Sequence, residues 1–141
     1  MTQNLKGLES LKIWQKSMDY AVDVCQNILP SLPSEEKWAL NSQLRRSVQS
    51  IPANIAEGYG RYSFQDSIRF FYIARGSILE TKTHLMLAYR LDYIDQELHY
   101  QYQYRLDELG KMLNGYISHM RRQKSNHSIN EEPIQDEDYD Y

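Results

Sequence analysis

Apolar residues recur every three or four positions in four separate segments of the chain, and this spacing decides the fold class. The segments cover residues 10–29, 35–57, 64–91 and 96–123. Such spacing gathers the apolar side chains on one face of an α-helix. No segment alternates apolar and polar residues for long enough to predict a strand. Four helices joined by short connections predict an all-α protein, an antiparallel up-down-up-down four-helix bundle.

Each segment has its own predicted apolar face. The first consists of Leu11, Trp14, Met18, Ala21, Cys25 and Ile28, and the second of Leu40, Leu44, Val48, Ile51 and Ile55. The third consists of Phe71, Ala74, Ile78, Leu85, Ala88 and Leu91, and the fourth of Leu98, Tyr102, Leu106, Leu109, Leu113, Tyr116 and Met120. We expect these four faces to form the core, because burial of apolar surface drives folding.

Prolines, glycines and short polar residues mark the expected helix ends. Pro30 and Pro33 stop the first helix, since proline has no amide hydrogen to donate. We expect Pro52 to kink the second helix, and Gly58 and Gly60 to end it through their backbone freedom. N-terminal caps are expected from Ser34, Ser63 and Asp95.

Charge is divided unevenly along the chain. Residues 125–141 contain no lysine or arginine, and they contain six acids: Glu131, Glu132, Asp136, Glu137, Asp138 and Asp140. The net charge of the whole chain is −3, so residues 1–124, with sixteen bases and thirteen acids, carry +3. We therefore expect a four-helix bundle over residues 1–124 and a disordered acidic tail over residues 125–141.

The sequence also bears on location and on cysteine chemistry. The first residues contain no apolar leader stretch, and no apolar run approaches the ~20 residues that cross a membrane. The single cysteine, Cys25, excludes an internal disulfide and a cysteine-rich zinc site, and we interpret it as a core residue. We expect a cytoplasmic protein that does not associate with membranes.

A family resemblance lies in two adjacent stretches, QLRRSVQSIPANIAEGYGRYS and RFFYIARGSILE, and in LKIWQKSMDYAV before them. Over residues 11–94 the chain resembles the four-helix-bundle proteins encoded in intervening sequences of bacterial 23S ribosomal RNA genes. That family is similar to the accessory proteins of diversity-generating retroelements, which form pentameric bundles with a basic surface and work with a reverse transcriptase and nucleic acid. The resemblance implies a homo-oligomer, with five subunits as the expected number.

Five polar residues of the second and third helices form a candidate cluster: Arg46, Asn54, Glu57, Ser77 and Glu80. Asn54 and Glu57 are three residues apart on one helix, so they share a face. Two carboxylates in such a cluster can act as acid and base if burial raises the pKa of one of them. We favour a structural polar cluster, in which the groups satisfy one another and fix helix register, and we expect no catalytic residue.

Spacing argues against a metal centre and against a phosphate loop. A di-metal carboxylate bundle needs Glu-x-x-His pairs on facing helices, and that motif is absent around His84, His99, His119 and His127. The Gly58–Gly60 stretch lacks the preceding strand and the lysine of a phosphate-binding loop. We therefore predict no metal ion and no cofactor.

Arginines with tyrosines among them are the predicted nucleic-acid-binding residues: Arg45, Arg46, Arg61, Arg69, Arg75, Arg90 and Arg105. Arginine binds phosphates, and aromatic rings stack on bases. The alternative is an ordinary solvated bundle face, because a charge of +3 is modest. We predict a non-enzymatic accessory protein whose partner is structured RNA or a nucleic-acid-processing protein. A self-assembling protein-interaction scaffold without a nucleic-acid role is the alternative.

Overall fold

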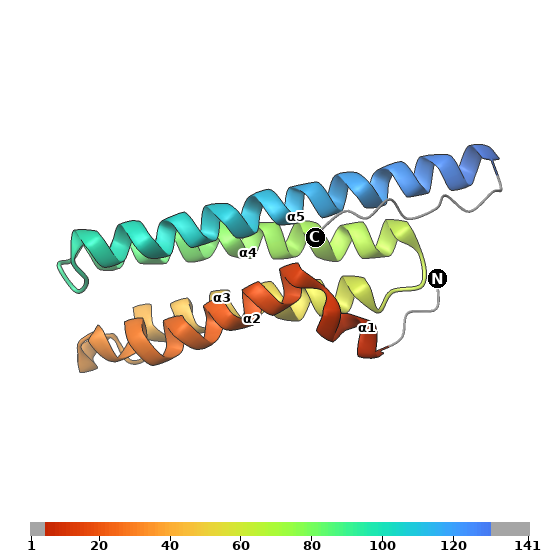
Figure 1. Ribbon diagram of the computed structural model, residues 1–141. Coiled ribbons are helices and arrows are strands. Elements are labelled where there is room, and N and C mark those ends of the chain that lie inside the picture. Colours follow the sequence, from red (N-terminus) through yellow and green to blue (C-terminus); the bar gives the residue numbers. More distant parts are fainter. Residues whose placement is uncertain (1–4, 131–141) are drawn as a thin grey trace.

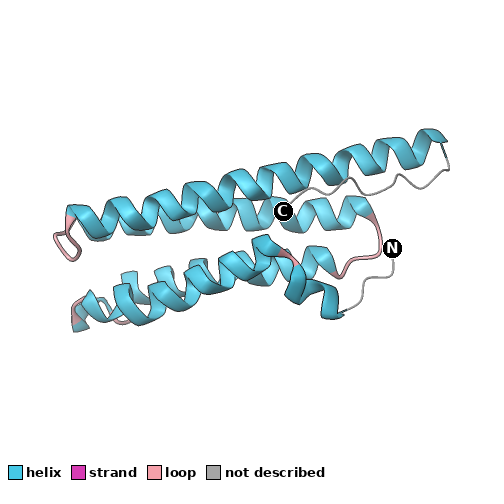
Figure 2. Cartoon of the chain, in the orientation of Figure 1, coloured by secondary structure: helices cyan, strands magenta, loops and turns pink. Residues whose placement is uncertain are grey.

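The computed structural model describes residues 5–130, and every regular element in that range is helical (Figure 1; Figure 2). The α-helices are α1 (Leu5–Ser10), α2 (Lys12–Asp23), α3 (Leu40–Tyr59), α4 (Phe64–Arg90) and α5 (Gln96–Asn130). A π-helical turn, Val24–Ile28, and a 3-10 turn, Leu29–Ser31, follow α2, and the 3-10 turn Ser34–Glu36 precedes α3. The predicted all-α class is confirmed. Within residues 5–130, no helix combines the length and the apolar character that membrane crossing demands.

The four long helices form an antiparallel bundle in two layers (Figure 1). α2 and α3 lie in one layer, α4 and α5 lie in the other, and successive helices run in opposite directions. α2 and α4 each pack on α3 and on α5, so α2 and α4 occupy diagonal corners. α5 extends past the other helices at the end where α3 turns into α4, which we call the α3–α4 end. The predicted up-down-up-down topology is confirmed.

The buried face of the first long helix differs from the prediction. Its core residues are Ile13, Ser17, Tyr20, Ala21, Val24 and Ile28. Of the predicted face only Ala21 and Ile28 are fully buried, and Met18 is 37% exposed. Ser17 is tolerated in the core because its hydroxyl donates to the Trp14 carbonyl oxygen at 2.9 Å. A polar residue in the middle of the true core face is the reason for the wrong prediction.

The other three predicted faces do form the core. Every residue of the second face is buried. In the third face every residue except Leu91 is buried, and in the fourth every residue except Leu98. Leu98 is partly buried against the core, whereas Leu91 is 45% exposed because α4 ends one residue before it. The chain then reverses direction through Asp92, which has a φ of 62°. Aspartate adopts this left-handed conformation more readily than most residues do.

Two of the three predicted caps are confirmed. At the start of α4, the Ser63 hydroxyl accepts a hydrogen bond from the Asp66 amide at 3.2 Å. At the start of α5, the Asp95 carboxylate accepts one from the Leu98 amide at 2.8 Å. Each cap satisfies an amide that has no partner within its own helix.

α3 begins later than predicted, its N-cap residue is Ala39, and the first amide of the helix is satisfied by an acidic side chain. Ser34 starts the separate 3-10 turn, and the carboxylate of Glu36 accepts a hydrogen bond from the Leu40 amide at 3.1 Å. The predicted cap at Ser34 is therefore wrong for α3. Pro52 lies inside α3, which continues to Tyr59, and the kink expected at Pro52 stays a prediction.

Gly58 has a different role from the predicted one. It is buried inside α3, and a Cβ atom built on it would lie 2.5 Å from Cε1 of Phe71 and 2.9 Å from the Ser67 carbonyl oxygen. Both of those residues belong to α4, so Gly58 permits a close approach of the two helices. Gly60 follows as the C-terminal cap residue with a φ of −81°. Neither glycine has a positive φ, so the predicted need for backbone freedom is wrong.

α5 continues beyond the predicted end of its helix. We expected the helix to end near Gln123, but α5 reaches Asn130. No glycine or proline occurs in residues 116–132, so nothing in the sequence breaks the helix earlier. Residues 131–141, which hold all six acids of the predicted tail, lie outside the described residues.

Candidate nucleic-acid interface

Two arginines flank the Phe70 ring near the start of α4. The guanidinium carbon of Arg61 lies 4.5 Å from the centre of that ring, and that of Arg69 lies 5.1 Å from it. Arg61 belongs to the connection between α3 and α4, and its Nη2 also lies 3.1 Å from Oε2 of Glu57. Contacts with a ring face hold a guanidinium in place without consuming its N–H donors.

The Tyr72 ring, half a turn further along α4, receives two more arginines. The guanidinium carbon of Arg75 lies 4.8 Å from the ring centre, and that of Arg121, from α5, lies 5.1 Å from it. Arg75 also donates a hydrogen bond to the Asn114 side chain of α5 at 3.3 Å. These contacts therefore connect α4 to the C-terminal part of α5.

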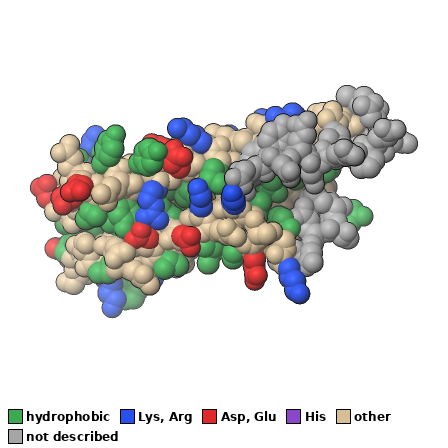
Figure 3. All heavy atoms as spheres, in the orientation of Figure 1, with side chains coloured by type: hydrophobic (Ala, Val, Ile, Leu, Met, Phe, Trp, Pro, Cys, Tyr) green, Lys and Arg blue, Asp and Glu red, His purple; other side chains and the backbone are tan. Residues whose placement is uncertain are grey.

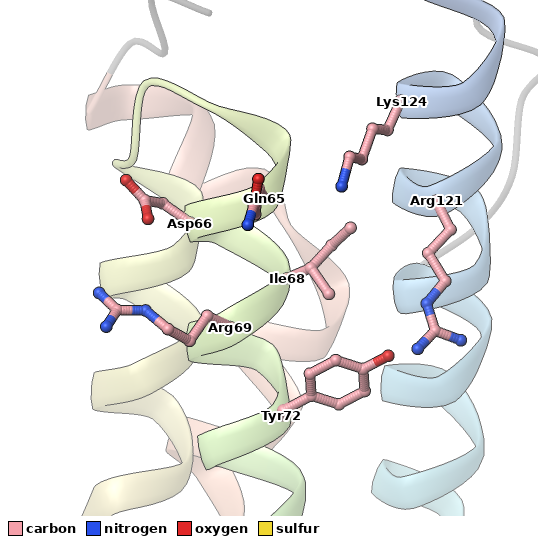
Figure 4. Close-up of a pocket in the computed structure, with 7 residues that line it drawn as sticks. All are labelled: Gln65, Asp66, Ile68, Arg69, Tyr72, Arg121 and Lys124. Carbon is pink, nitrogen blue, oxygen red and sulfur yellow. The ribbon is translucent and has the colours of Figure 1, made fainter. Parts of the chain in front are cut away.

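A pocket of about 650 Å³ lies between α4 and α5 at the α3–α4 end (Figure 4). Its lining consists of Gln65, Asp66, Ile68, Arg69, Tyr72, Arg121 and Lys124. Arg121 and Lys124 reach from α5 toward α4, and the Tyr72 hydroxyl points toward α5 (Figure 4). That hydroxyl oxygen is buried and has no hydrogen-bond partner among the described residues.

These groups lie along the first half of α4 and the part of α5 beside it, and we call them together the basic end patch: Arg61, Arg69, Phe70, Tyr72, Arg75, Arg121 and Lys124. Phe70 and Tyr72 point to opposite sides of α4, and the Arg69 side chain points away from α5 (Figure 4), so the patch covers two flanks of α4. Glu57 pairs with Arg61 and Asp66 lines the pocket, so two carboxylates offset part of the positive charge. Guanidinium and ammonium donors bind phosphate oxygens, and aromatic rings offer stacking surface. The patch therefore has the chemistry to bind an anionic polymer.

The structure separates the other four predicted arginines from this patch. Arg105 forms an ion pair with α2, and Arg46 pairs with a carboxylate of α4. Arg45 lines a groove between α2 and α3, and Arg90 is exposed at the opposite end of α4. Of the predicted nucleic-acid-binding residues, the basic end patch therefore contains Arg61, Arg69 and Arg75.

The predicted polar cluster divides into three parts. Arg46 Nη2 lies 3.4 Å from Glu80 Oε1 at the surface, and the imidazole of His84 contacts the same oxygen at 3.4 Å. Glu57 is separate from this group and pairs with Arg61. The third part contains the remaining two predicted residues and lies partly buried between α3 and α4.

This third part is a ladder of hydroxyl groups. Ser77 Oγ lies 2.8 Å from Ser50 Oγ, and the Asn54 side-chain amide donates to the Ser50 hydroxyl at 2.9 Å. One turn away, Thr81 Oγ1 lies 3.0 Å from Ser47 Oγ. Satisfied hydrogen bonds between two helices fix their register. Ser47, Ser50 and Thr81 were missed. Ser50 lies four residues from Asn54 and Thr81 four from Ser77, and this helical spacing was an available signal.

A second polar cluster, absent from the sequence-based predictions, joins α2 to α5. The Tyr102 hydroxyl donates to Asp23 Oδ1 at 2.6 Å, and Arg105 forms an ion pair with Asp23. Burial and the bond to Asp23 raise the pKa of Tyr102 to about 12, and burial also raises the pKa of Tyr20 beside it. Burial opposes ionisation of Asp23, but hydrogen bonds from Tyr102, Arg105 and Asn27 outweigh it, so the pKa of Asp23 lies below its ordinary value.

Replacing Asp23 by asparagine is expected to lower the free energy of unfolding by about 1 kcal/mol at neutral pH, because hydrogen bonds to a partly exposed carboxylate are lost. The folded-state pKa of Asp23 is depressed, so the stability from its ionisation is present above its unfolded pKa of about 4. That stability is lost as the pH falls through the folded-state pKa. The difference between wild type and variant should therefore shrink below about pH 4, as urea titrations at several pH values will measure.

Asp19→Asn is the matched control for this prediction. Asp19 lies on α2, one turn before Asp23, and is exposed. The control removes the same charge and should leave the free energy of unfolding within about 0.5 kcal/mol of wild type. A constant deficit of the Asp23 variant from neutral to acidic pH would contradict the stabilising role of its ionised form.

Two bases of the patch were absent from the predicted set, which stopped at Arg105. Arg121 and Lys124 belong to the stretch HMRRQK, whose run of bases was the available signal. No group of three His, Cys, Asp or Glu side chains that suits a metal ion occurs within the described part of the chain. That the protein lacks a metal ion, a cofactor and a catalytic residue stays a prediction.

Comparison with known proteins bears out the resemblance to the 23S rRNA intervening-sequence proteins. Residues 9–115 match the model of the family described as 23S rRNA-intervening sequence protein. A crystal structure of a protein with unknown function from the S23 ribosomal protein family of Bacteroides thetaiotaomicron VPI-5482 is 32% identical, with a TM-score of 0.69, and covers 74% of this chain and 97% of that one. No curated protein matches the chain. Since the matched range contains α2, α3, α4 and more than half of α5, the chain belongs to the 23S rRNA-intervening sequence protein family.

Proposed function

We propose that this protein is a non-enzymatic, oligomeric accessory protein of the cytoplasm that binds structured RNA through the basic end patch. The patch is the observation that carries the proposal, because it places five bases and two aromatic rings at one end of a bundle. Phosphate contacts supply much of the affinity of a protein for RNA, and stacking on aromatic rings adds to it. The family description, which refers to 23S rRNA, points to the same class of partner.

The proposal retains the expected likeness to the accessory proteins of diversity-generating retroelements. Proteins of that kind work with a reverse transcriptase, so a nucleic-acid-processing protein is a further proposed partner. Such a partner would meet the bundle on a surface other than the basic end patch when RNA occupies the patch.

Two uncovered apolar surfaces support the proposed assembly. A groove of about 520 Å³ between α2 and α3 is lined by Trp14, Met18, Val22, Cys25, Pro52 and Ala53, among others. The outer face of α4 exposes Ile73, Leu79 and Leu87 by 46%, 61% and 45%. Gly76 on this face has no atom within 4 Å of an added Cβ, so a second backbone has room to approach. Large apolar patches are rare on monomers, and we propose a homo-oligomer with five subunits as the expected number.

The apolar surfaces also favour a second candidate function. On the face shown in Figure 3, hydrophobic side chains reach the surface between the two layers of helices, with Lys and Arg side chains among them. A self-assembling scaffold that binds other proteins through these surfaces needs no nucleic acid. A measurement of RNA binding distinguishes the accessory protein from the scaffold.

The RNA experiment compares two pairs of substitutions with equal charge change. Arg69→Gln with Arg121→Gln removes two guanidinium groups of the patch, and Lys37→Gln with Arg90→Gln removes two exposed bases at the opposite end of the bundle. Fluorescence anisotropy with a labelled RNA hairpin at about 50 and 200 mM salt gives the affinities. We expect about a tenfold loss for the patch pair, and a salt slope reduced by about one for each base removed.

The control pair should stay within about twofold of wild type, since its bases lie far from the patch. Equal losses in both pairs would mean that net charge, rather than the patch, determines binding. If the wild-type protein binds the hairpin no better than an unrelated protein of similar acidity, the RNA role fails and the scaffold function becomes the better conclusion.

A further inference from the structure

We infer that the acidic segment 131–141 occupies the pocket of the basic end patch and competes there with RNA. The competition with RNA rests on the proposed function, because it regulates RNA binding at the same site. The contact between segment and pocket does not depend on that function, since it follows from their charges, the length of the segment and the shape of the pocket. The occupant is thus a named segment of the same chain, and the contact is intramolecular.

The acidic segment and the pocket carry opposite charges. The acidic segment carries six carboxylates and no base, whereas the pocket is lined by Arg69, Arg121 and Lys124 with Asp66 as its one acid. Opposite charges within a few ångströms attract at a partly buried site more strongly than on open surface. The segment is therefore the most complementary polyanion that the chain itself offers to this pocket.

The acidic segment is long enough to return to the pocket. α5 ends at Asn130, six residues beyond Lys124, which corresponds to about 9 Å along a helix. Eleven further residues span up to about 36 Å when extended. The acidic segment can therefore fold back along α5 to the pocket with several residues to spare.

The pocket suits the acidic segment in its size and in its chemistry. The pocket of about 650 Å³ lies within the usual size range of binding sites, and Ile68 gives it an apolar wall. The Tyr72 hydroxyl has no partner among the described residues and points into the space between α4 and α5 (Figure 4). A carboxylate is an acceptor for that hydroxyl as well as for the guanidinium of Arg121.

A tethered occupant competes effectively even when its contact is weak. Short linkers give effective concentrations in the millimolar range. RNA must displace the segment before its phosphates reach the same bases, so the observed RNA affinity falls while the intrinsic affinity of the patch is unchanged. Salt weakens the contact of the patch with the segment and its contact with RNA. The difference in RNA affinity between the patch with the segment bound and the patch without it should therefore shrink as the salt concentration rises.

The test keeps the full chain and changes only the charge of the segment. The neutral-segment variant carries Glu131→Gln, Glu132→Gln, Asp136→Asn, Glu137→Gln, Asp138→Asn and Asp140→Asn. The matched control exchanges Glu for Asp and Asp for Glu at the same six positions and keeps the charge. With the labelled RNA hairpin, we expect the neutral-segment variant to bind about fivefold more tightly than wild type near 50 mM salt, and within about twofold of it near 200 mM. The control should match wild type.

A second measurement detects the contact without RNA. A fluorescent peptide of residues 131–141 is titrated with the neutral-segment variant, whose own segment no longer competes. Saturable binding is expected, and it should be lost when Arg69→Gln and Arg121→Gln are added. It should persist when Lys37→Gln and Arg90→Gln are added instead.

The outcomes separate this inference from the proposed function. If the peptide binds the patch but RNA binds no variant, the proposed function fails and the contact stands. If RNA binds, the peptide does not, and neutralisation changes nothing, the inference fails and RNA binding stands. Tighter RNA binding by the neutral-segment variant, without peptide binding at protein concentrations up to about 1 mM, would also overturn the inference, because general repulsion would then explain the effect.

Discussion

Gly58→Ala is expected to lower the free energy of unfolding by about 2 kcal/mol, one of the largest effects that a single added methyl group can have in this chain. The new Cβ would lie 2.5 Å from Cε1 and 2.8 Å from Cδ1 of Phe71, and 2.9 Å from the Ser67 carbonyl oxygen. The Phe71 ring is fully buried and cannot turn away, and the third contact is with backbone. Relief therefore requires α3 and α4 to move apart along a well-packed interface.

Gly110→Ala is the matched control, because it makes the same chemical change in α5. Nothing lies within 4 Å of a Cβ at Gly110, so the higher helix propensity of alanine should stabilise that variant by up to about 1 kcal/mol. Urea unfolding measures both variants. Adding Phe71→Leu to Gly58→Ala should recover part of the loss, since the two changes share a contact. Equal effects of alanine at Gly58 and Gly110 would contradict the close approach.

Periodicity predicted three of the four helical faces because their apolar core residues recur at helical spacing, even though α4 also buries Ser67, Ser77 and Thr81. It failed on α2, where Ser17 and Tyr20 occupy core positions and a competing stripe of Trp14, Met18 and Cys25 also has helical spacing. Ser17 is buried only because a backbone carbonyl of its own helix accepts its hydroxyl hydrogen. The competing stripe has a separate place in the fold, since it lines the groove between α2 and α3.

The polar residues were harder to place, because spacing along one helix says nothing of the register between two helices. Asn54 and Glu57 share a face of α3, yet Asn54 bonds to Ser50 beside α4 while Glu57 pairs with Arg61. Close packing at Gly58 helps to set the relative position of α3 and α4, and that packing is invisible in the sequence pattern. The sequence thus indicated which residues take part in polar interactions better than it indicated their partners.

In the basic end patch too, spacing within one helix does not reveal contacts between helices, and here the residues are further apart in the chain. Arg69 and Arg121 are 52 positions apart in the chain, and they line one pocket because α4 and α5 are antiparallel. The topology alone places the start of α4 beside the late part of α5. A prediction that combined the bundle topology with the base run HMRRQK would have found Arg121 and Lys124.

Light scattering in moderate salt is expected to give a mass several times 16.8 kDa, as the proposed assembly requires. The groove between α2 and α3 and the exposed face of α4 are different surfaces, and α2 and α4 occupy diagonal corners of the bundle. Pairing of two different surfaces is heterologous and continues from subunit to subunit until a ring closes. A strict monomer at micromolar concentration would remove this proposal.

Single charges at the two surfaces test the pairing. Val22→Asp places a carboxylate in the groove, and Leu79→Asp places one on the α4 face. Each variant alone should have the mass of a monomer, because burying an unpaired charge costs more than the contact contributes. Tyr100→Asp, at a 74% exposed site on α5, is the control and should assemble like wild type.

Mixing the two variants gives the sharpest result. The Val22→Asp chain keeps an intact α4 face, and the Leu79→Asp chain keeps an intact groove, so one sound interface forms between them. An equimolar mixture should therefore show a species of about twice the monomer mass, although neither variant assembles alone. If like surfaces paired instead, at least one variant would still form a dimer by itself through its unmodified surface, and mixing would create no new species. That observation would replace the heterologous arrangement by an isologous one, in which a ring of five subunits cannot form from one interface.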